Sequence, residues 1–161
     1  MLLVSDANIF IDLEKIGVLH FFDKLDFTVA TSDFVYTELN QRQQEIVSGL
    51  HIEVFEMDAD ELMHFYDEFM KQNLKKISYQ DYSIFYYAKK YQGEVLSNDK
   101  RLRIYAAKKS IPVKGLSYIL DVMISRNCVG KKEMIEKLLM LKEINKRLPL
   151  KEIEERIEKL K

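Results

Sequence analysis

Hydrophobic residues along the chain alternate between short continuous runs and longer segments of helical spacing. Five short, mostly apolar runs have the length of a buried strand, and they lie at Leu2–Val4, Phe27–Ala30, Ile52–Phe55, Val95–Leu96 and Ile111–Val113. Between these runs, apolar residues recur three and four positions apart, which predicts helices. Strands that alternate with helices are typical of a mostly parallel sheet. The pattern therefore predicts a three-layer α/β/α fold around a central sheet of four to five strands.

Capping residues indicate where several of the predicted helices begin. Thr31 or Ser32 is a suitable cap for a helix that we expect to run on to Val47. Asp58 and Ser78 are each followed three positions later by an acidic residue, which is the capping-box pattern that opens a helix.

The pattern changes at residue 117, after which only helical spacing is found. Three helices are predicted at about 117–127, 130–145 and 149–161, and Pro149 suits a first helical position. No Gly/Ser-rich linker separates this segment from the rest. We expect residues 1–116 to form the α/β domain and residues 117–161 to pack on it as a helical extension, within a single structural unit.

Composition narrows the functional classes. The 161 residues include 25 Lys and Arg against 26 Asp and Glu, so the net charge of −1 excludes a polycation that coats nucleic acid by bulk charge. The single cysteine, Cys128, allows neither an internal disulfide nor a cysteine-based zinc site. No apolar run approaches the roughly 20 residues of a membrane span. We expect a cytoplasmic protein without a membrane segment.

Four carboxylates fall where a parallel sheet collects its functional residues. Asp6 and Asp99 follow predicted strands, and Glu38 and Asp81 lie in the first turns of helices that begin at the same edge. The loops at the carboxyl ends of parallel strands form the ligand crevice of such folds. We therefore expect the four side chains to face one cleft, with Glu38 on the same side of its helix as the core residues.

Carboxylates that lie close together repel one another, and the cluster stays ionised only when cations lie among them. Oxygen ligands of this kind select hard ions, Mg²⁺ or Mn²⁺. One or two such ions can hold and polarise a phosphodiester without a nucleophilic side chain. Each acid also has an ordinary structural role open to it: Asp81 as a capping partner, Glu38 as a helix-surface residue, and Asp6 and Asp99 as loop acids. The combination of all four favours a nuclease.

Polar residues near these acids are candidates for supporting roles. Asn8 and Ser97 each lie two residues from an acid and are placed either to hydrogen-bond the metal ligands or to cap loops. Lys100, Arg101 and Arg103 follow Asp99 directly and are candidate contacts for RNA phosphates.

Three tyrosines, Tyr79, Tyr82 and Tyr86, share one side of a predicted helix. Such a stripe can stack on single-stranded bases. It is more often a packing surface, and that interpretation is favoured here.

The segments that carry the four acids together resemble the PIN domain, the fold of the VapC-type toxin ribonucleases. The four segments are Ser5-Asp6-Ala7-Asn8-Ile9-Phe10-Ile11, residues 31–39 with Glu38, residues 79–84 with Asp81, and Leu96-Ser97-Asn98-Asp99. This resemblance implies an endoribonuclease that uses Mg²⁺ or Mn²⁺, with the four acids as catalytic metal ligands, RNA as substrate, an antitoxin protein as partner and a homodimeric assembly.

Two departures from the family pattern bear on these expectations. Many relatives carry a further acid soon after the one that corresponds to Asp99, where this chain has Lys100, Arg101 and Arg103. The helical extension resembles that of a PIN subgroup.

Two other functions remain as alternatives. One is a catalytically weak PIN-like module that binds RNA or a protein in the same cleft. The other is an aspartate-nucleophile phosphatase, but that chemistry needs a second aspartate at the position of Asn8, which argues against it.

Overall fold

The computed structural model describes residues 1–161 and contains one sheet of five strands, all of them parallel to their neighbours. The strands are β1 (Leu2–Ser5), β2 (Thr28–Ser32), β3 (Ile52–Phe55), β4 (Glu94–Leu96) and β5 (Val113–Lys114), in the spatial order β3-β2-β1-β4-β5. The predicted parallel α/β/α fold is confirmed. The last strand lies slightly later than predicted, and Pro112 stays outside it because proline has no N–H for a sheet ladder.

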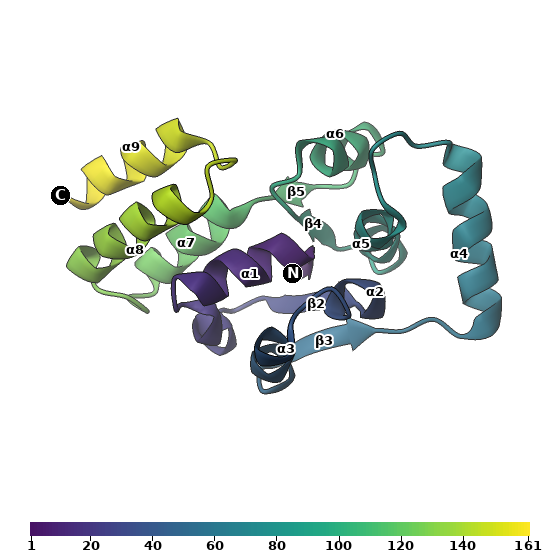
Figure 1. Ribbon diagram of the computed structural model, residues 1–161, viewed down its shortest axis with the longest axis horizontal. Helices are drawn as coiled ribbons and strands as arrows, with labels where there is room; N and C mark the ends of the chain where they lie inside the picture. The colour runs from purple at the N-terminus through teal and green to yellow at the C-terminus, as the bar shows by residue number, and fades with distance from the viewer.

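Helices cover both faces of this sheet (Figure 1). They are α1 (Ala7–Lys15), the 3-10 helix η1 (Leu19–Lys24), α2 (Asp33–Tyr36), α3 (Gln41–Ser48), α4 (Ala59–Gln72), α5 (Tyr79–Lys90), α6 (Lys100–Lys108), α7 (Leu116–Ser125), α8 (Lys131–Ile144) and α9 (Leu150–Leu160). Helix α1 contacts α3, and α5 contacts α6. Right-handed crossovers place these two pairs on opposite faces. Helix α5 packs against β1, β2 and β4, so its first turn lies at the carboxyl edge of the central strands.

The segment after β2 differs from the prediction of one helix running to Val47. It forms two helices, α2 and α3, separated by a turn at residues 37–40. Asn40 accepts a hydrogen bond from the Gln43 N–H at 2.9 Å, and the Gln43 side chain accepts one from the Asn40 N–H at 2.9 Å. This reciprocal capping box satisfies free N–H groups at the start of α3, which is why a new helix begins there instead of α2 continuing.

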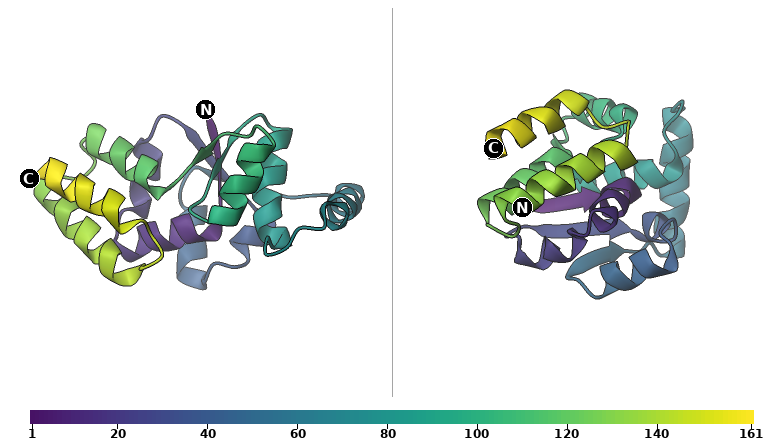
Figure 2. Two further views of the ribbon diagram at one scale, coloured as in Figure 1. Left: turned by 90° about the horizontal axis from the view of Figure 1, so that it is seen from above. Right: turned by 60° about the vertical axis from the view of Figure 1, so that its left-hand side comes forward.

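The C-terminal helices share the core of the α/β domain. A single cluster of 37 buried hydrophobic residues includes Met123, Leu138 and Ile153 from α7, α8 and α9. Asn145, at the end of α8, also donates a hydrogen bond of 2.8 Å to the buried Asp12 of α1. Both views in Figure 2 show these helices gathered at one end of the molecule. None of the helices combines the length and the apolar composition that crossing a membrane requires.

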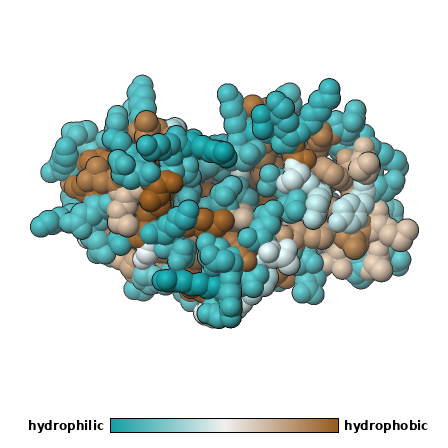
Figure 3. All heavy atoms as spheres, in the orientation of Figure 1, coloured by the Kyte–Doolittle hydropathy of each residue, from teal (hydrophilic) through white to brown (hydrophobic).

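Helix α4 stands at the opposite end of the molecule from the C-terminal helices, apart from the sheet (Figure 1). Its buried anchor is Phe65, whereas Met63 and Met70 are each 73% exposed and Tyr66 is 38% exposed. Light-brown atoms accordingly gather at this end of the surface in Figure 3. Helix α4 therefore presents apolar and aromatic side chains to solvent.

Candidate active site

Asp6 and Asp99 are tied together by one buried serine at the carboxyl edge of the sheet. Asp6 follows β1 and caps α1, accepting a hydrogen bond of 3.2 Å from the Ile9 N–H. The buried Ser97 hydroxyl donates to the other carboxylate oxygen of Asp6 and accepts from the Asp99 N–H at 3.0 Å. Asp99 in turn caps α6 through the Leu102 N–H at 2.8 Å. The two aspartates are therefore held in fixed orientations just beyond the carboxyl ends of the adjacent strands β1 and β4.

Asp81 lies in the first turn of α5, and its carboxylate takes no part in capping. The Asp81 N–H donates to the Ser78 hydroxyl at 3.1 Å, which caps the helix. A complete capping box would add a bond from the Ser78 N–H to the Asp81 carboxylate, as the Asn40 and Gln43 pair does. No such reciprocal bond is formed. The Asp81 carboxylate is therefore available for another ligand.

Glu38 does not lie where the sequence predicted. It is in the turn after α2, where its N–H donates to the Val35 carbonyl at 3.0 Å, and its side chain is exposed rather than turned toward the core. The cause is the early end of α2, which removes Glu38 from the helical face expected for it. Partial burial raises the pKa of Glu38, and the charge of Asp81 adds to this rise, so the two carboxylates lie near each other.

The pKa values of Asp6, Glu38 and Asp81 are raised, in each case with a contribution from a neighbouring acid of the set. The pKa of Asp6 is raised to about 7, chiefly by burial; hydrogen bonds from Ser97 and Ile9 lower it, and the charges of Asp81 and Asp99 add to the rise. The pKa of Asp81 is also raised, chiefly by burial and then by Asp99. The pKa of Glu38 is raised by partial burial and then by Asp81. No Lys or Arg is among the groups that shift these three carboxyls. Asp6, Asp81 and Asp99 thus lie near one another, and Glu38 lies near Asp81, without a cationic partner from the chain.

The four carboxylates have the chemistry to bind a hard divalent cation, but their side chains are not yet positioned to coordinate one. All four side chains offer carboxylate oxygens, the ligands that Mg²⁺ and Mn²⁺ prefer. No group of three or more His, Cys, Asp or Glu side chains is already arranged to hold a metal ion. Asp6 and Asp99 are fixed by hydrogen bonds, whereas the Asp81 and Glu38 carboxylates make none. We expect rotation of these two side chains to bring their oxygens to a cation held by Asp6 and Asp99.

A network of buried hydroxyls supports the same edge of the sheet, and the sequence analysis did not identify it. The Thr31 hydroxyl donates to the Ser5 carbonyl at 2.7 Å, which links β2 to β1. The Ser32 and Ser83 hydroxyls lie 2.7 Å apart and link the start of α2 to α5. These residues are fully buried. Polar residues at the carboxyl ends of predicted strands are the sequence signal that indicates such a network.

The turn between β4 and α6 is fixed by a second set of contacts, around Gly115. The Asn98 side-chain oxygen accepts from the Leu116 N–H at 3.0 Å. Arg103 donates from its guanidinium to the Ser97 carbonyl at 2.7 Å. Arg103, predicted to contact RNA phosphates, is thus used within the turn that carries Asp99.

The remaining predicted residues differ in their surroundings. Lys100 and Arg101 are exposed and form no ion pair, so both are available to a phosphate. Asn8 is also exposed, and its side chain makes no hydrogen bond to the acids. Of the two residues predicted to support the acids, only Ser97 contacts them in this structure.

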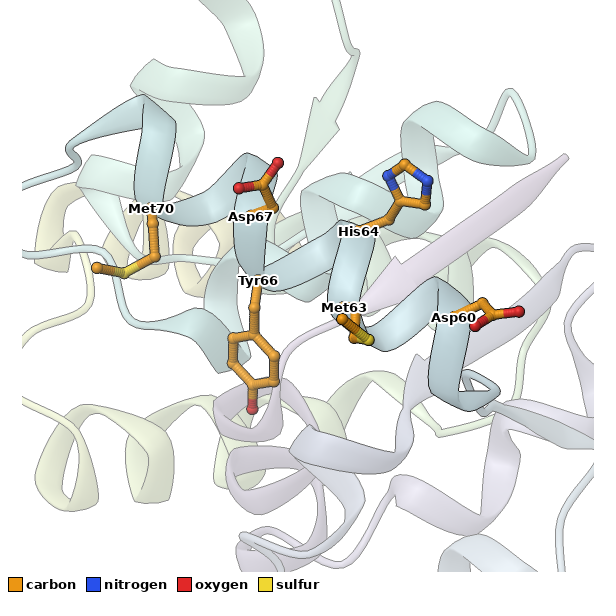
Figure 4. A pocket seen from close by; sticks show the side chains of 6 residues that line it. All are labelled: Asp60, Met63, His64, Tyr66, Asp67 and Met70. Carbon is orange, nitrogen blue, oxygen red and sulfur yellow. The ribbon is translucent and has the colours of Figure 1, made fainter.

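A surface hollow lies elsewhere, on α4. Six side chains of that helix line it: Asp60, Met63, His64, Tyr66, Asp67 and Met70 (Figure 4). None of the four acids contributes to it. Its single-helix lining and openness make it a surface rather than a reaction chamber.

Comparisons with known proteins identify the family of the chain. A family model described as a PIN domain matches residues 2–161, which includes the C-terminal helices. No curated protein matches the chain.

Proposed function

Because the chain belongs to the PIN-domain family, whose members are generally nucleases, we propose that it is a ribonuclease dependent on Mg²⁺ or Mn²⁺. The observation that carries this proposal is the placement of Asp6 and Asp99, joined through Ser97 at the carboxyl edge of the sheet, with Asp81 near enough for its charge to raise the pKa of Asp6. Burying charges without a partner is costly, so a site of this kind is retained where a ligand compensates the cost. The toxin role, the antitoxin partner and the dimer implied by the resemblance stay predictions.

In the proposed mechanism, Asp6 and Asp99 act as the fixed ligands. Their hydrogen bonds with Ile9, Ser97 and Leu102 leave each carboxylate with one defined orientation. Glu38 and Asp81 act as the mobile ligands that complete the site. These four residues would hold a divalent cation, and the chemistry it would supply is a lowered pKa of a water molecule and stabilisation of the charge that develops on the phosphate. This chemistry requires no side-chain nucleophile. An aspartate-nucleophile phosphatase would need a second aspartate at position 8, where this chain has an exposed Asn8 that makes no side-chain hydrogen bond.

Cleavage of RNA by the purified full-length chain tests this proposal. We expect a single-stranded RNA to be cut in Mn²⁺ or Mg²⁺, and cutting to stop with a chelator. Asp99→Asn is expected to reduce the rate at least about 100-fold, because loss of a fixed ligand weakens both cation binding and charge stabilisation. Gel analysis of end-labelled RNA measures both effects.

The control for this experiment is Glu136→Gln, which removes an exposed carboxylate of α8 far from the site. Equal cleavage by the wild type and a folded Asp99→Asn variant would contradict the proposal, since the activity would then come from another site or a contaminant.

Lys100 and Arg101 are expected to bind the RNA backbone. Both lie in the first turn of α6, where positive charge opposes the helix dipole, and that turn contains no acid. Replacing either with Gln is expected to weaken RNA binding similarly for all sequences and to lower the slope of log affinity against log salt by about 0.7. Fluorescence anisotropy at several salt concentrations measures this slope.

Arg103→Gln provides the contrasting variant for this prediction. Because Arg103 donates to the Ser97 carbonyl, its replacement is expected to lower thermal stability rather than the salt slope. A change in slope at Arg103 without one at Arg101 would contradict these assignments.

The second candidate function is a PIN-like module that binds RNA without efficient cleavage. Two observations favour it: Lys100 and Arg101 stand where many relatives carry a further acid, and no three carboxylates are grouped closely enough to hold a metal ion. Tight RNA binding without turnover in Mg²⁺ or Mn²⁺ would select this function over the first.

A further inference from the structure

Three aromatic side chains form a connected surface group beside the acids. The ring centres of Phe34 and Tyr79 lie 5.5 Å apart, those of Tyr66 and Tyr79 5.8 Å, and those of Phe34 and Tyr66 6.3 Å. We call Phe34, Tyr66 and Tyr79 the aromatic trio. It rests on the fully buried Phe65, whose ring centre is 5.5 Å from that of Phe34 and 5.5 Å from that of Tyr66.

The trio differs from the other aromatic residues of this region in its exposure. Tyr66 is 38% exposed and Tyr79 is 37% exposed, whereas Tyr82 is only 3% exposed. The Tyr86 hydroxyl donates to Glu61 at 2.9 Å, which ties that ring to α4. Of the three tyrosines in the predicted stripe, Tyr79 is thus the one whose ring is offered to solvent, and it is joined there by residues of two other helices.

The trio is continuous with the candidate active site because the same two segments build both. Phe34 lies in α2, one turn before Glu38, and Tyr79 begins α5, two residues before Asp81. The Ser32 and Ser83 hydroxyls, 2.7 Å apart, hold these segments together. A strand of nucleic acid that reaches Glu38 and Asp81 therefore meets the two segments that also carry Phe34 and Tyr79.

Two lysines near the trio are free to contact a polyanion, among acidic neighbours that include Asp33 and Asp60. Lys75 and Lys76 lie in the loop that leads from α4 into Tyr79, and both are exposed without an ion pair. Asp67 of α4 is neutralised by Lys71 at 2.9 Å. Figure 4 shows Tyr66 projecting from the side of α4 opposite to His64 and Asp67.

We propose that the aromatic trio is a stacking subsite that holds unpaired bases of single-stranded RNA beside the acid site. The inference rests on the proposed ribonuclease function and names its substrate class. Exposed aromatic rings bind bases of any sequence by stacking, at about 1–3 kcal/mol per base, and this binding requires bases that are free of a partner strand. The subsite therefore selects single strands over duplexes and adds little sequence preference.

Binding measurements on full-length variants test the subsite. In an Asp6→Asn background, which prevents cleavage, anisotropy is measured with a short single-stranded RNA, the same strand with abasic riboses, and the same strand in a duplex. We expect the abasic strand and the duplex to bind about 10- to 100-fold more weakly than the single strand. The double change Tyr66→Leu and Tyr79→Leu is expected to cost a similar factor with the base-bearing strand and to leave abasic binding unchanged.

Two controls separate stacking from folding. Tyr66→Phe and Tyr79→Phe keep the rings and are expected to keep the affinity. Tyr91→Leu removes a ring that is 45% exposed at the far end of α5 and is expected to have no effect on RNA binding.

Several results would overturn the subsite. One is an equal loss on base-bearing and abasic strands, and another is no loss on either. A third is a leucine double variant that turns a dimer into a monomer in sedimentation while its RNA affinity is unchanged, which would assign this surface to a second copy of the chain.

Cleavage measurements keep the two proposals distinguishable. Metal-dependent cleavage by the leucine double variant with an unchanged KM would reject the subsite and leave the ribonuclease function intact. Base-dependent binding in a chain that no divalent cation activates would support the subsite and reject the ribonuclease.

Discussion

Replacing Asp6 with asparagine is expected to stabilise the metal-free protein above neutral pH while it abolishes RNA cleavage. Burial raises the pKa of Asp6 from 3.8 to about 7, so the folded state favours the protonated carboxyl. Ionising it in the fold costs at most about 4 kcal/mol by linkage, and asparagine removes that cost. The amide cannot reproduce every hydrogen bond that Ser97 and Ile9 make to the acid. We therefore expect a net gain of about 1–2 kcal/mol, or about 2–8 °C in Tm.

The sign of the pH dependence follows from the direction of this shift. Between the unfolded value of 3.8 and the folded value of about 7, the native state binds more protons than the unfolded state. The stability of the wild type therefore falls as the pH rises through this window. As the pH rises from 3.8 to about 7, the free energy of unfolding of chelator-treated wild type is expected to fall progressively relative to that of Asp6→Asn. Urea denaturation at several pH values measures this difference.

A divalent cation is expected to make the wild type more stable than Asp6→Asn. Mn²⁺ binds the native site and not the unfolded chain, so it raises the Tm of the wild type and leaves that of Asp6→Asn nearly unchanged. Glu136→Gln controls for the loss of one negative charge and is expected to follow the wild type throughout. An Asp6→Asn variant that is less stable than the wild type at every pH would contradict the buried-charge account.

Adding a methyl group at residue 115 is expected to have the second large effect. A Cβ on Gly115 would lie 2.5 Å from the Asn98 side-chain oxygen and 3.0 Å from the Arg103 guanidinium. Relieving this clash breaks the hydrogen bonds to the Leu116 N–H and the Ser97 carbonyl. We expect Gly115→Ala to cost about 1–3 kcal/mol in the free energy of unfolding and to lower cleavage, because Asn98 and Ser97 directly precede Asp99.

Two further variants show whether the loss at Gly115 comes from this contact. Gly49→Ala is the matched control, since a Cβ there meets only ordinary contacts of 3.5 and 3.6 Å. Adding Asn98→Ala to Gly115→Ala removes the clashing atom, so the double variant is expected to lose less than the sum of the single variants. If the losses of stability in the two single variants simply add in the double variant, the effect of Gly115→Ala does not come from its contact with Asn98.

The sequence was sufficient for the fold because the strands are short, apolar and separated by helical spacing. Each of the five predicted strands exists, and their parallel arrangement follows from the alternation with helices. The division between α2 and α3 was missed because the Asn40 and Gln43 capping box lies within a segment whose apolar spacing is continuous. That local hydrogen-bonding preference prevailed over periodicity and moved Glu38 to the surface.

The site could be predicted in part for a similar reason. Asp6 and Asp99 follow strands, and the position of strand ends is set by topology, so their proximity could be inferred from the sequence. The hydrogen bond from Arg103 to the Ser97 carbonyl could not be inferred from the sequence. It depends on the close approach of Gly115 to Asn98, and these two residues are distant in sequence. The aromatic trio likewise joins α2, α4 and α5, and only its Tyr79 member was visible as a sequence pattern.

The most direct test of the four-acid cation site is a crystal structure of the full chain soaked in Mn²⁺, with anomalous diffraction to locate the ion. The account predicts an anomalous peak bound by Asp6 and Asp99, with the Asp81 and Glu38 side chains turned toward it, and no peak in crystals of Asp6→Asn. A fully soaked crystal with no peak among these four carboxylates, or with the same peak in Asp6→Asn, would contradict it.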